Sequence, residues 1–266
     1  MELIGYIASI LIGVLLGLIG GGGSILTVPV LVYLFGIVPV TATAYSLFIV
    51  GTTSVVGSIT YFKKGLVNLR TALVFGIPSI VAVYLTRKYL LPALPDTMAQ
   101  IGSIAISKDL FLMVLFALLM LAAAYTMLKK SPAPEQKNVS SEAQKFNYPL
   151  IVLEGMVVGT LTGLVGAGGG FLIIPALVLL SKLPMKEAVG TSLVIIAAKS
   201  LIGFTGELGQ ADLDWTLLLS LTGLAVVGIF IGAWLTKWIK SEQLKPAFGG
   251  FVLIMGVYIL FKEMSA

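Results

Sequence analysis

Two stretches of this sequence decide its fold: GVLLGLIGGGGSILTVP at residues 13–29 and GTLTGLVGAGGGFLIIP at residues 159–175. They align without a gap when the chain is shifted by 146 positions, so that glycines fall on glycines and proline falls on proline. The same shift places Ser46 on Ser192. Matches of Leu and Val arise easily in an apolar sequence, whereas repeated matches of Gly, Pro and Ser do not. The pattern therefore predicts an internal duplication.

The composition around these stretches is typical of a membrane protein. Of the 266 residues, 58% are apolar and 11% are charged, whereas soluble domains average about 45–50% and about 25%. A bilayer span takes about 20 apolar residues. Apolar segments lie at 3–19, 25–38, 40–62, 66–91 and 108–128, and then at 148–165, 171–183, 186–206, 213–237 and 242–262. We expect an all-α integral membrane protein, a polytopic helical bundle of two repeats with about five helical segments each.

Two missing residue types narrow the possible functions. The chain contains no Cys and no His, so it has no disulfide, no thiol nucleophile, no thiolate metal site and no imidazole base. We therefore predict no metal site, no cofactor, no nucleic-acid partner and no catalytic residue. An intramembrane enzyme with a carboxylate mechanism and an assembly scaffold remain alternatives.

A polar break at residues 129–147, KKSPAPEQKNVSSEAQKFN, separates a first transmembrane repeat at 1–128 from a second at 148–266. Its Pro, Ser, Gln and charge content is typical of an unfolded linker. Five crossings in each half place twelve of the seventeen basic residues on the side of this linker, as expected for cytoplasmic loops. An odd number of crossings also makes the repeats antiparallel. We predict inverted repeats in the cytoplasmic membrane, a cytoplasmic linker and both termini outside.

Each half begins with two short segments that are joined by glycines. Segment 25–38 would span only about 21 Å, so it is open whether these segments cross fully or are re-entrant. Glycine-interrupted short helices at matching positions indicate a binding site at the membrane midplane, where helix N-termini attract anions. The predicted substrate-binding positions are Gly20, Gly21, Gly22, Gly23 and Ser24 in one half, and Gly166, Gly168, Gly169 and Gly170 in the other.

The alternative role for glycine is close packing of helices. We favour packing for the three pairs with GxxxG spacing. These pairs are Gly13 with Gly17, Gly159 with Gly163, and Gly228 with Gly232.

The third segment of each half carries polar side chains within an apolar run. Ser46, Thr191 and Ser192 complete the predicted substrate-binding set, although such hydroxyls also bond to their own helices. Lys199 lies midway along IIAAKSLIG, where a basic residue costs about 2.5–3.5 kcal/mol on insertion scales. We expect its ammonium to attract the anion.

Acidic residues offer a different explanation for Lys199. It could pair with Glu154 or Glu207, or extend to the membrane interface. Glu154 is also a candidate for proton coupling, with an interfacial position as the alternative. We expect Glu207, Asp212 and Asp214 to be solvated charges of an outer loop.

The duplicated pattern G-x-x-x-G-L-x-G-x-G-G-[GS]-x-x-x-x-P, followed in both halves by Ser-Leu, resembles the TauE/SafE-type sulfite exporter family. The resemblance covers nearly the whole chain except the linker. It implies a multi-pass transporter of small anions such as sulfite, sulfonates or related organic acids, in many members an exporter. With the predicted site, it favours secondary transport by alternating access, coupled to H+ or Na+. An anion channel that uses the same helix ends is the alternative.

Overall fold

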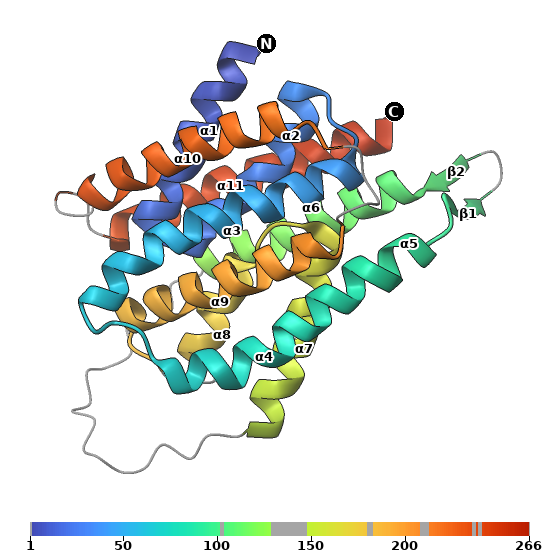
Figure 1. Cartoon of the computed structure of the whole chain (residues 1–266). Helices are drawn as coiled ribbons and strands as arrows, with labels where there is room; N and C mark the ends of the chain where they lie inside the picture. The colour runs from blue at the N-terminus through green and yellow to red at the C-terminus, as the bar shows by residue number, and fades with distance from the viewer. Residues whose placement is uncertain are drawn as a thin grey trace.

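The computed structural model describes residues 2–101, 104–128, 148–179, 183–207, 213–235, 238 and 241–265, and these are almost entirely helical (Figure 1). The first half contains α1 (Glu2–Ile19), the 3-10 helix η1 (Gly21–Leu26), α2 (Thr27–Phe35), α3 (Pro39–Lys63), α4 (Leu69–Leu85), the π-helix η2 (Thr86–Leu90), α5 (Leu91–Ala93) and α6 (Lys108–Leu128). The second half contains α7 (Tyr148–Val165), α8 (Gly170–Leu179), α9 (Met185–Thr205), α10 (Trp215–Leu235) and α11 (Ser241–Ser265). The predicted all-α polytopic architecture is confirmed, while the predicted linker at 129–147 lies outside the described residues.

Long apolar helices form the body of the molecule. Within the described residues, five are long and apolar enough to cross a bilayer: Pro39–Lys63, Leu69–Ala93, Lys108–Leu128, Met185–Thr205 and Trp215–Leu235. The outer face of α4 exposes one large apolar side chain in every four residues. These side chains are Leu69, Leu73, Ile77, Val81 and Leu85, each about half exposed. A stripe of this kind would be a large apolar patch on a soluble protein, so this face contacts hydrocarbon.

Two of the membrane-spanning helices, α4 and α10, are preceded by a residue whose side chain caps the helix N-terminus. Asn68 precedes α4 and its Oδ1 accepts from Thr71 N–H at 2.9 Å. Asp214 precedes α10 and its Oδ1 accepts from Thr216 N–H at 2.9 Å and from Leu217 N–H at 3.1 Å. Such caps satisfy backbone donors that the first helical turn leaves unpaired. The two caps lie 146 positions apart, as the duplicated sequence requires.

The glycine pairs with GxxxG spacing are packing sites, as predicted. A Cβ on Gly13 of α1 would lie 2.9 Å from the Cα of Gly228 on α10. A Cβ on Gly159 of α7 would lie 2.8 Å from the Cβ of Ala82 on α4. Both approaches are closer than a side chain tolerates, so glycine allows the backbones of α1 and α10, and of α7 and α4, to touch.

Helices α3 and α9 form the centre of the bundle, between the α1 and α10 pair and the α4 and α7 pair (Figure 1). Gly57 near the end of α3 faces Leu193 near the start of α9, and Gly203 near the end of α9 faces Leu47 near the start of α3. The two helices therefore run antiparallel. Because these two contacts are related by the 146-residue shift, the packing repeats along with the sequence.

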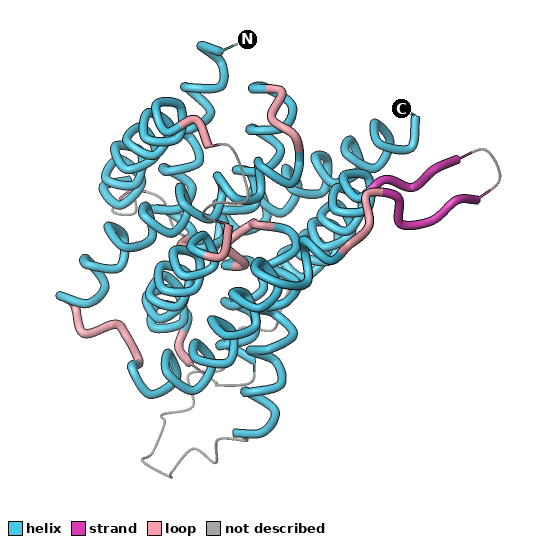
Figure 2. The backbone as a smooth tube through the Cα atoms, turned by 45° about the vertical axis from the view of Figure 1, so that its right-hand side comes forward, coloured by secondary structure: helices cyan, strands magenta, loops and turns pink. Residues whose placement is uncertain are grey.

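A β-hairpin was not predicted from the sequence. Strands β1 (Thr97–Ile101) and β2 (Ile104–Ser107) pair antiparallel between α5 and α6. The hairpin projects from the helical body (Figure 2). It falls between two predicted apolar segments, where the helical pattern of the sequence stops.

The packing role of glycine predicts opposite outcomes at two positions of α10. A Cβ on Gly228 would meet the carbonyl oxygen of Ile10, whereas a Cβ on Gly223 would meet nothing within 4 Å. We expect Gly228→Ala to lower the melting temperature of the detergent-purified protein, because overpacking costs about 1–3 kcal/mol. Gly223→Ala is the matched control and should melt no lower than the unmodified protein, since Ala is the better helix former. Equal melting temperatures would contradict the packing role.

Candidate functional site

The two glycine clusters meet in the middle of the molecule. A Cβ on Gly21 would lie 2.6 Å from the Cα of Gly170, so the backbones of η1 and α8 are in contact. A Cβ on Gly168 would lie 3.5 Å from the Cβ of Ser24. The structure thus brings together residues that the sequence separates by about half the chain.

Glycine is required at this junction by backbone conformation as well as by space. Gly20 has φ 75° and Gly166 has φ 71°, values that L side chains rarely adopt. Gly20 lies against Val189 of α9, and Gly166 lies against Thr43 of α3. These two contacts are again related by the 146-residue shift. Each glycine turn therefore packs against the central helix of the opposite half.

The helix starts at the two clusters are not equivalent. Helix α8 begins at Gly170, one residue before the predicted segment 171–183, and the N–H groups of Leu172 and Ile173 donate to Gly169 O at 3.0 and 2.9 Å. Only the N–H groups of Gly170 and Phe171 in this first turn lack acceptors within the helix. In the first half the helical backbone begins earlier, as the 3-10 helix from Gly21 to Leu26. Ser24 lies inside that turn and donates its hydroxyl to Gly21 O at 2.7 Å. The helical backbone therefore begins about one turn earlier than the predicted segment 25–38.

Lys199 lies beside the start of α8. Its side chain is 0% exposed, and its Nζ donates to Oγ1 of Thr162 at 3.0 Å. A Cβ on Gly169 would lie 2.6 Å from this Nζ, so the ammonium contacts the last residue before α8. Thr162 in turn donates to Gly159 O at 3.2 Å. The hydroxyl of Thr162 thus orients the lysine toward the glycine turn.

The alternative explanations of Lys199 from the sequence are not supported. Glu207 forms a salt bridge with Arg87 at 3.0 Å, and no acidic side chain of the described residues forms one with Lys199. Glu154 lies two turns before Thr162 on α7 and is half-buried. Complete burial also excludes an ammonium that extends to the membrane interface. Lys199 is therefore a buried cation whose described partner is a hydroxyl.

The predicted hydroxyl residues divide into two groups. Ser46 is buried and its Oγ has no partner, as is also true of Ser54 and Ser200 at the middle of α3 and α9. Ser192 donates to Val189 O of its own helix at 2.8 Å. Thr191 accepts from Asn68 N–H at 2.9 Å, so it lies at the start of α4 and not at the glycine turns. These contacts give Thr191 and Ser192 packing partners, while Ser46 keeps a free hydroxyl.

A buried ion pair was missed by the sequence analysis. Arg87 and Glu207 are 0% and 3% exposed, whereas Glu207 was expected in an outer loop. They lie 120 positions apart, and no local pattern links them. Glu207 is thus not the solvated charge that was expected. Asp214 caps α10, and Asp212 lies outside the described residues.

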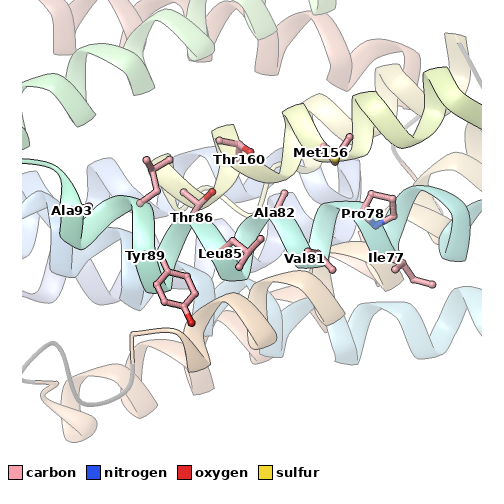
Figure 3. Close-up of a pocket in the computed structure, with 11 residues that line it drawn as sticks. Ile77, Pro78, Val81, Ala82, Leu85, Thr86, Tyr89, Ala93, Met156 and Thr160 are labelled. Carbon is pink, nitrogen blue, oxygen red and sulfur yellow. The ribbon is translucent and has the colours of Figure 1, made fainter.

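An apolar groove of about 680 Å³ lies between α4 and α7, away from this site (Figure 3). Ile77, Val81 and Tyr89 line it and are more than half exposed. Thr86 and Thr160 contribute hydroxyls, but no charged side chain lines it. The groove is therefore part of the surface that faces lipid, and it is not suited to an anion.

The fold and the site define a multi-pass α-helical membrane protein with a buried cation at a break between helices. Comparison with known proteins agrees with this class. The model of the family described as "Sulfite exporter TauE/SafE" matches residues 6–259, and the chain belongs to this family. It is accordingly a membrane transporter, as the sequence pattern predicts.

Curated relatives of the chain carry names of the same kind. A protein of Xylella fastidiosa (strain 9a5c), named "Probable membrane transporter protein", is 28% identical over 260 residues, which are 96% of this chain and 94% of the relative. "Probable membrane transporter protein YdhB" of Bacillus subtilis is 26% identical over 253 residues, which are 94% and 97% of the two chains. These names specify no substrate. No solved structure matches the chain significantly.

The contact between Thr162 and Lys199 can be tested through stability. We expect Thr162→Val to lower the melting temperature, because a buried polar group that loses its partner costs about 1–3 kcal/mol. The matched control is Thr160→Val on the same helix, since Thr160 lines the groove and does not contact Lys199. Adding Lys199→Met to Thr162→Val should recover stability. If both Thr→Val variants melt alike, Thr162 does not support the lysine.

Proposed function

We propose that the protein is a secondary transporter of a small anion, which binds between Lys199 and the start of α8 and is carried by alternating access. One observation carries the proposal: a fully buried ammonium whose described partner is a single neutral hydroxyl. A buried charge without a counter-charge is costly. A bound anion would supply that counter-charge.

The start of α8 adds a second attraction for the same anion. The N-terminus of a helix carries a partial positive charge and free N–H donors. The space beside Gly169 and Gly170 is filled by Thr162, Lys199 and the backbone of Gly21. A ligand would therefore reach these donors only after the helices move apart. The unpaired hydroxyls of Ser46, Ser54 and Ser200 are further donors from the central helices. The substrate-binding set of the proposal therefore keeps Lys199, Ser46 and the glycine clusters at its centre.

We assign the substrate to the small sulfur-containing anions, such as sulfite and sulfonates, and to related organic acids. The family description supports sulfite or a related oxyanion. An oxyanion with several acceptor atoms also fits a site made of an ammonium, backbone N–H groups and hydroxyls. The direction of transport in this proposal is export, and the coupling ion is H+ or Na+. Glu154 is the candidate proton carrier.

Two inverted repeats would provide the moving parts. The contacts of Gly13 and Gly159, of Gly20 and Gly166, and of Gly57 and Gly203 recur at the 146-residue shift. The antiparallel arrangement of α3 and α9 supports the inverted relation. Transporters of this kind rock one repeat against the other around a fixed site.

Burial of Lys199 favours a transporter over a channel. Its side chain is 0% exposed, and the glycine clusters contact each other directly beside it. An anion could therefore reach Lys199 only after a movement of the helices. A channel would instead need a path that is open to both sides at once.

Loss of the ammonium should abolish transport. We expect Lys199→Ala and Lys199→Met to insert and purify as monodisperse protein but to lose uptake or efflux of radiolabelled sulfite in proteoliposomes. Lys88→Gln is the control, because Lys88 is exposed and contacts Tyr84. Unchanged transport by the Lys199 variants would contradict the proposed site.

Binding can be measured without knowing the direction of transport. The melting temperature should be recorded with sulfite, sulfate, thiosulfate, taurine, sulfoacetate, acetate and phosphate. A ligand at a hundred times its Kd stabilises by about 2.7 kcal/mol. We expect a selective increase with a sulfur oxyanion or a sulfonate, which Lys199→Met removes. No increase with any of them would contradict an anionic substrate.

The proposed orientation can be tested by labelling, because the chain contains no Cys. We expect Ser140→Cys, in the linker, to react with a membrane-impermeant maleimide only after the cells are opened. Ser265→Cys, at the end of α11, should react in intact cells if the C-terminus is outside. Labelling of both variants in intact cells would contradict the inverted arrangement.

A further inference from the structure

A second fully buried cation, Arg87, lies close to the first turn of the glycine loop between α7 and α8. Its Nη1 donates to Oγ1 of Thr43 at 2.9 Å and to Oε1 of Glu207 at 3.0 Å. Thr43 is the residue against which Gly166 packs. Thr43 thus connects Arg87 with Gly166 of the loop between α7 and α8.

Only part of the guanidinium is used in these bonds. Nε and Nη2 of Arg87 are buried and have no hydrogen-bond partner. These two nitrogens lie on the same edge of the planar group, and their N–H bonds point in parallel. This edge is the fork that binds carboxylates and other oxyanions through two bonds at once. Burial of donors without acceptors is costly, so an unoccupied fork needs an explanation.

The local backbone also sets Arg87 apart. It lies in the π-helix η2 (Thr86–Leu90), where Leu91 N–H bonds to Thr86 O across a wide turn. Such π-turns within helices are frequent at functional sites. A Cβ on Gly206 would lie 3.2 Å from Cβ of Arg87. The absence of a side chain at Gly206 leaves room for the arginine stem.

The contacts of Arg87 with Glu207 and Thr43 have no counterpart in the duplicated sequence. The 146-residue shift relates Arg87 to Ala233, Glu207 to Tyr61 and Thr43 to Val189. At the equivalent place in the other half, the sequence therefore provides no charge. A purely structural set of contacts would be expected at both equivalent places of the duplicated fold, whereas this one occurs at only one of them.

We propose that the Nε and Nη2 edge of Arg87 is a binding site for an oxyanion, distinct from Lys199. Carboxylate, sulfite and sulfonate groups each present two acceptor oxygens to this edge. Glu207 holds the guanidinium in place through Nη1 and leaves the fork free. A role of the Arg87 site as a second binding site on the transport path rests on the proposed function, whereas anion binding at Arg87 does not.

The test compares anion binding in four proteins: the unmodified chain, Lys199→Met, Arg87→Lys and the double variant. The probes are sodium sulfite, sodium methanesulfonate and sodium acetate, with sodium chloride at matched ionic strength. The apparent Kd is taken from the dose-dependent increase in melting temperature. Arg87→Lys keeps the charge and the contact with Glu207 but removes the fork, and the loss of one charge-assisted bond corresponds to about tenfold weaker binding.

We expect Lys199→Met to retain stabilisation by at least one probe, and Arg87→Lys in that background to weaken the apparent Kd about tenfold. Glu207→Gln should tighten binding, because it removes a negative charge beside the fork while keeping an acceptor for Nη1. Lys88→Gln removes the neighbouring positive charge without touching the fork and should leave the apparent Kd unchanged. Each variant is first checked for monodispersity and for its melting temperature without anion.

The outcomes separate this inference from the proposed function. Stabilisation that Lys199→Met abolishes and Arg87→Lys leaves intact would overturn the Arg87 site and support the Lys199 site. Binding that only Arg87→Lys weakens, by about tenfold or more, would support the Arg87 site and overturn Lys199 as the binding residue. No stabilisation of the unmodified chain by any probe would overturn both.

Discussion

The direct contact between the backbones of η1 and α8 is the constraint on which the rest of this structure depends. At Gly21 and Gly170 no side chain fits between the two segments, and Gly20 and Gly166 require positive φ angles as well. Irregular backbone inside a membrane is tolerated only where protein or water satisfies its polar groups. The long helices α3 and α9 supply that cover, because they enclose the junction on both sides. The need to bury two broken helices thus explains why the most buried spans lie at the centre.

The charges inside the bundle follow from the same constraint. Arg87 is held by Glu207 and Thr43, whereas Lys199 is held by Thr162. An ion pair deep in an apolar environment compensates much of the cost of burying its members. A lysine with a hydroxyl partner has no such compensation. The two basic residues therefore differ in their surroundings: Arg87 is fixed by an ion pair with Glu207, whereas Lys199 lies beside the glycine clusters without an acidic partner among the described residues.

The sequence predicts most of the fold because apolar length and repeated glycine are local properties. The ten expected segments correspond closely to helices, and the GxxxG pairs lie at close helix contacts as predicted, although the spacing does not specify which helices they join. The candidate site is predicted less completely. Lys199 and the glycine clusters are visible as unusual residues in apolar runs, but Thr162 looks like any hydroxyl. Arg87 lies near the end of a predicted apolar segment, and Glu207 resembles a loop charge. Their burial depends on contacts across 37 and 120 positions, which a single sequence does not reveal.

Equivalent positions at which the two halves carry different residues are also informative. Tyr45 and Thr191 occupy equivalent positions, and each bonds to the N-cap residue of the opposite half, Asp214 or Asn68. Different side chains therefore preserve the same contact where the fold requires it. Lys199 has Thr53 at its equivalent position, and Arg87 has Ala233. The asymmetry is thus concentrated in the buried cations and not in the contacts between helices. Two halves that pack alike but carry different buried charges form a symmetric framework around an asymmetric pair of basic residues, and this asymmetry agrees with the proposed binding of one small anion away from the axis of the repeats.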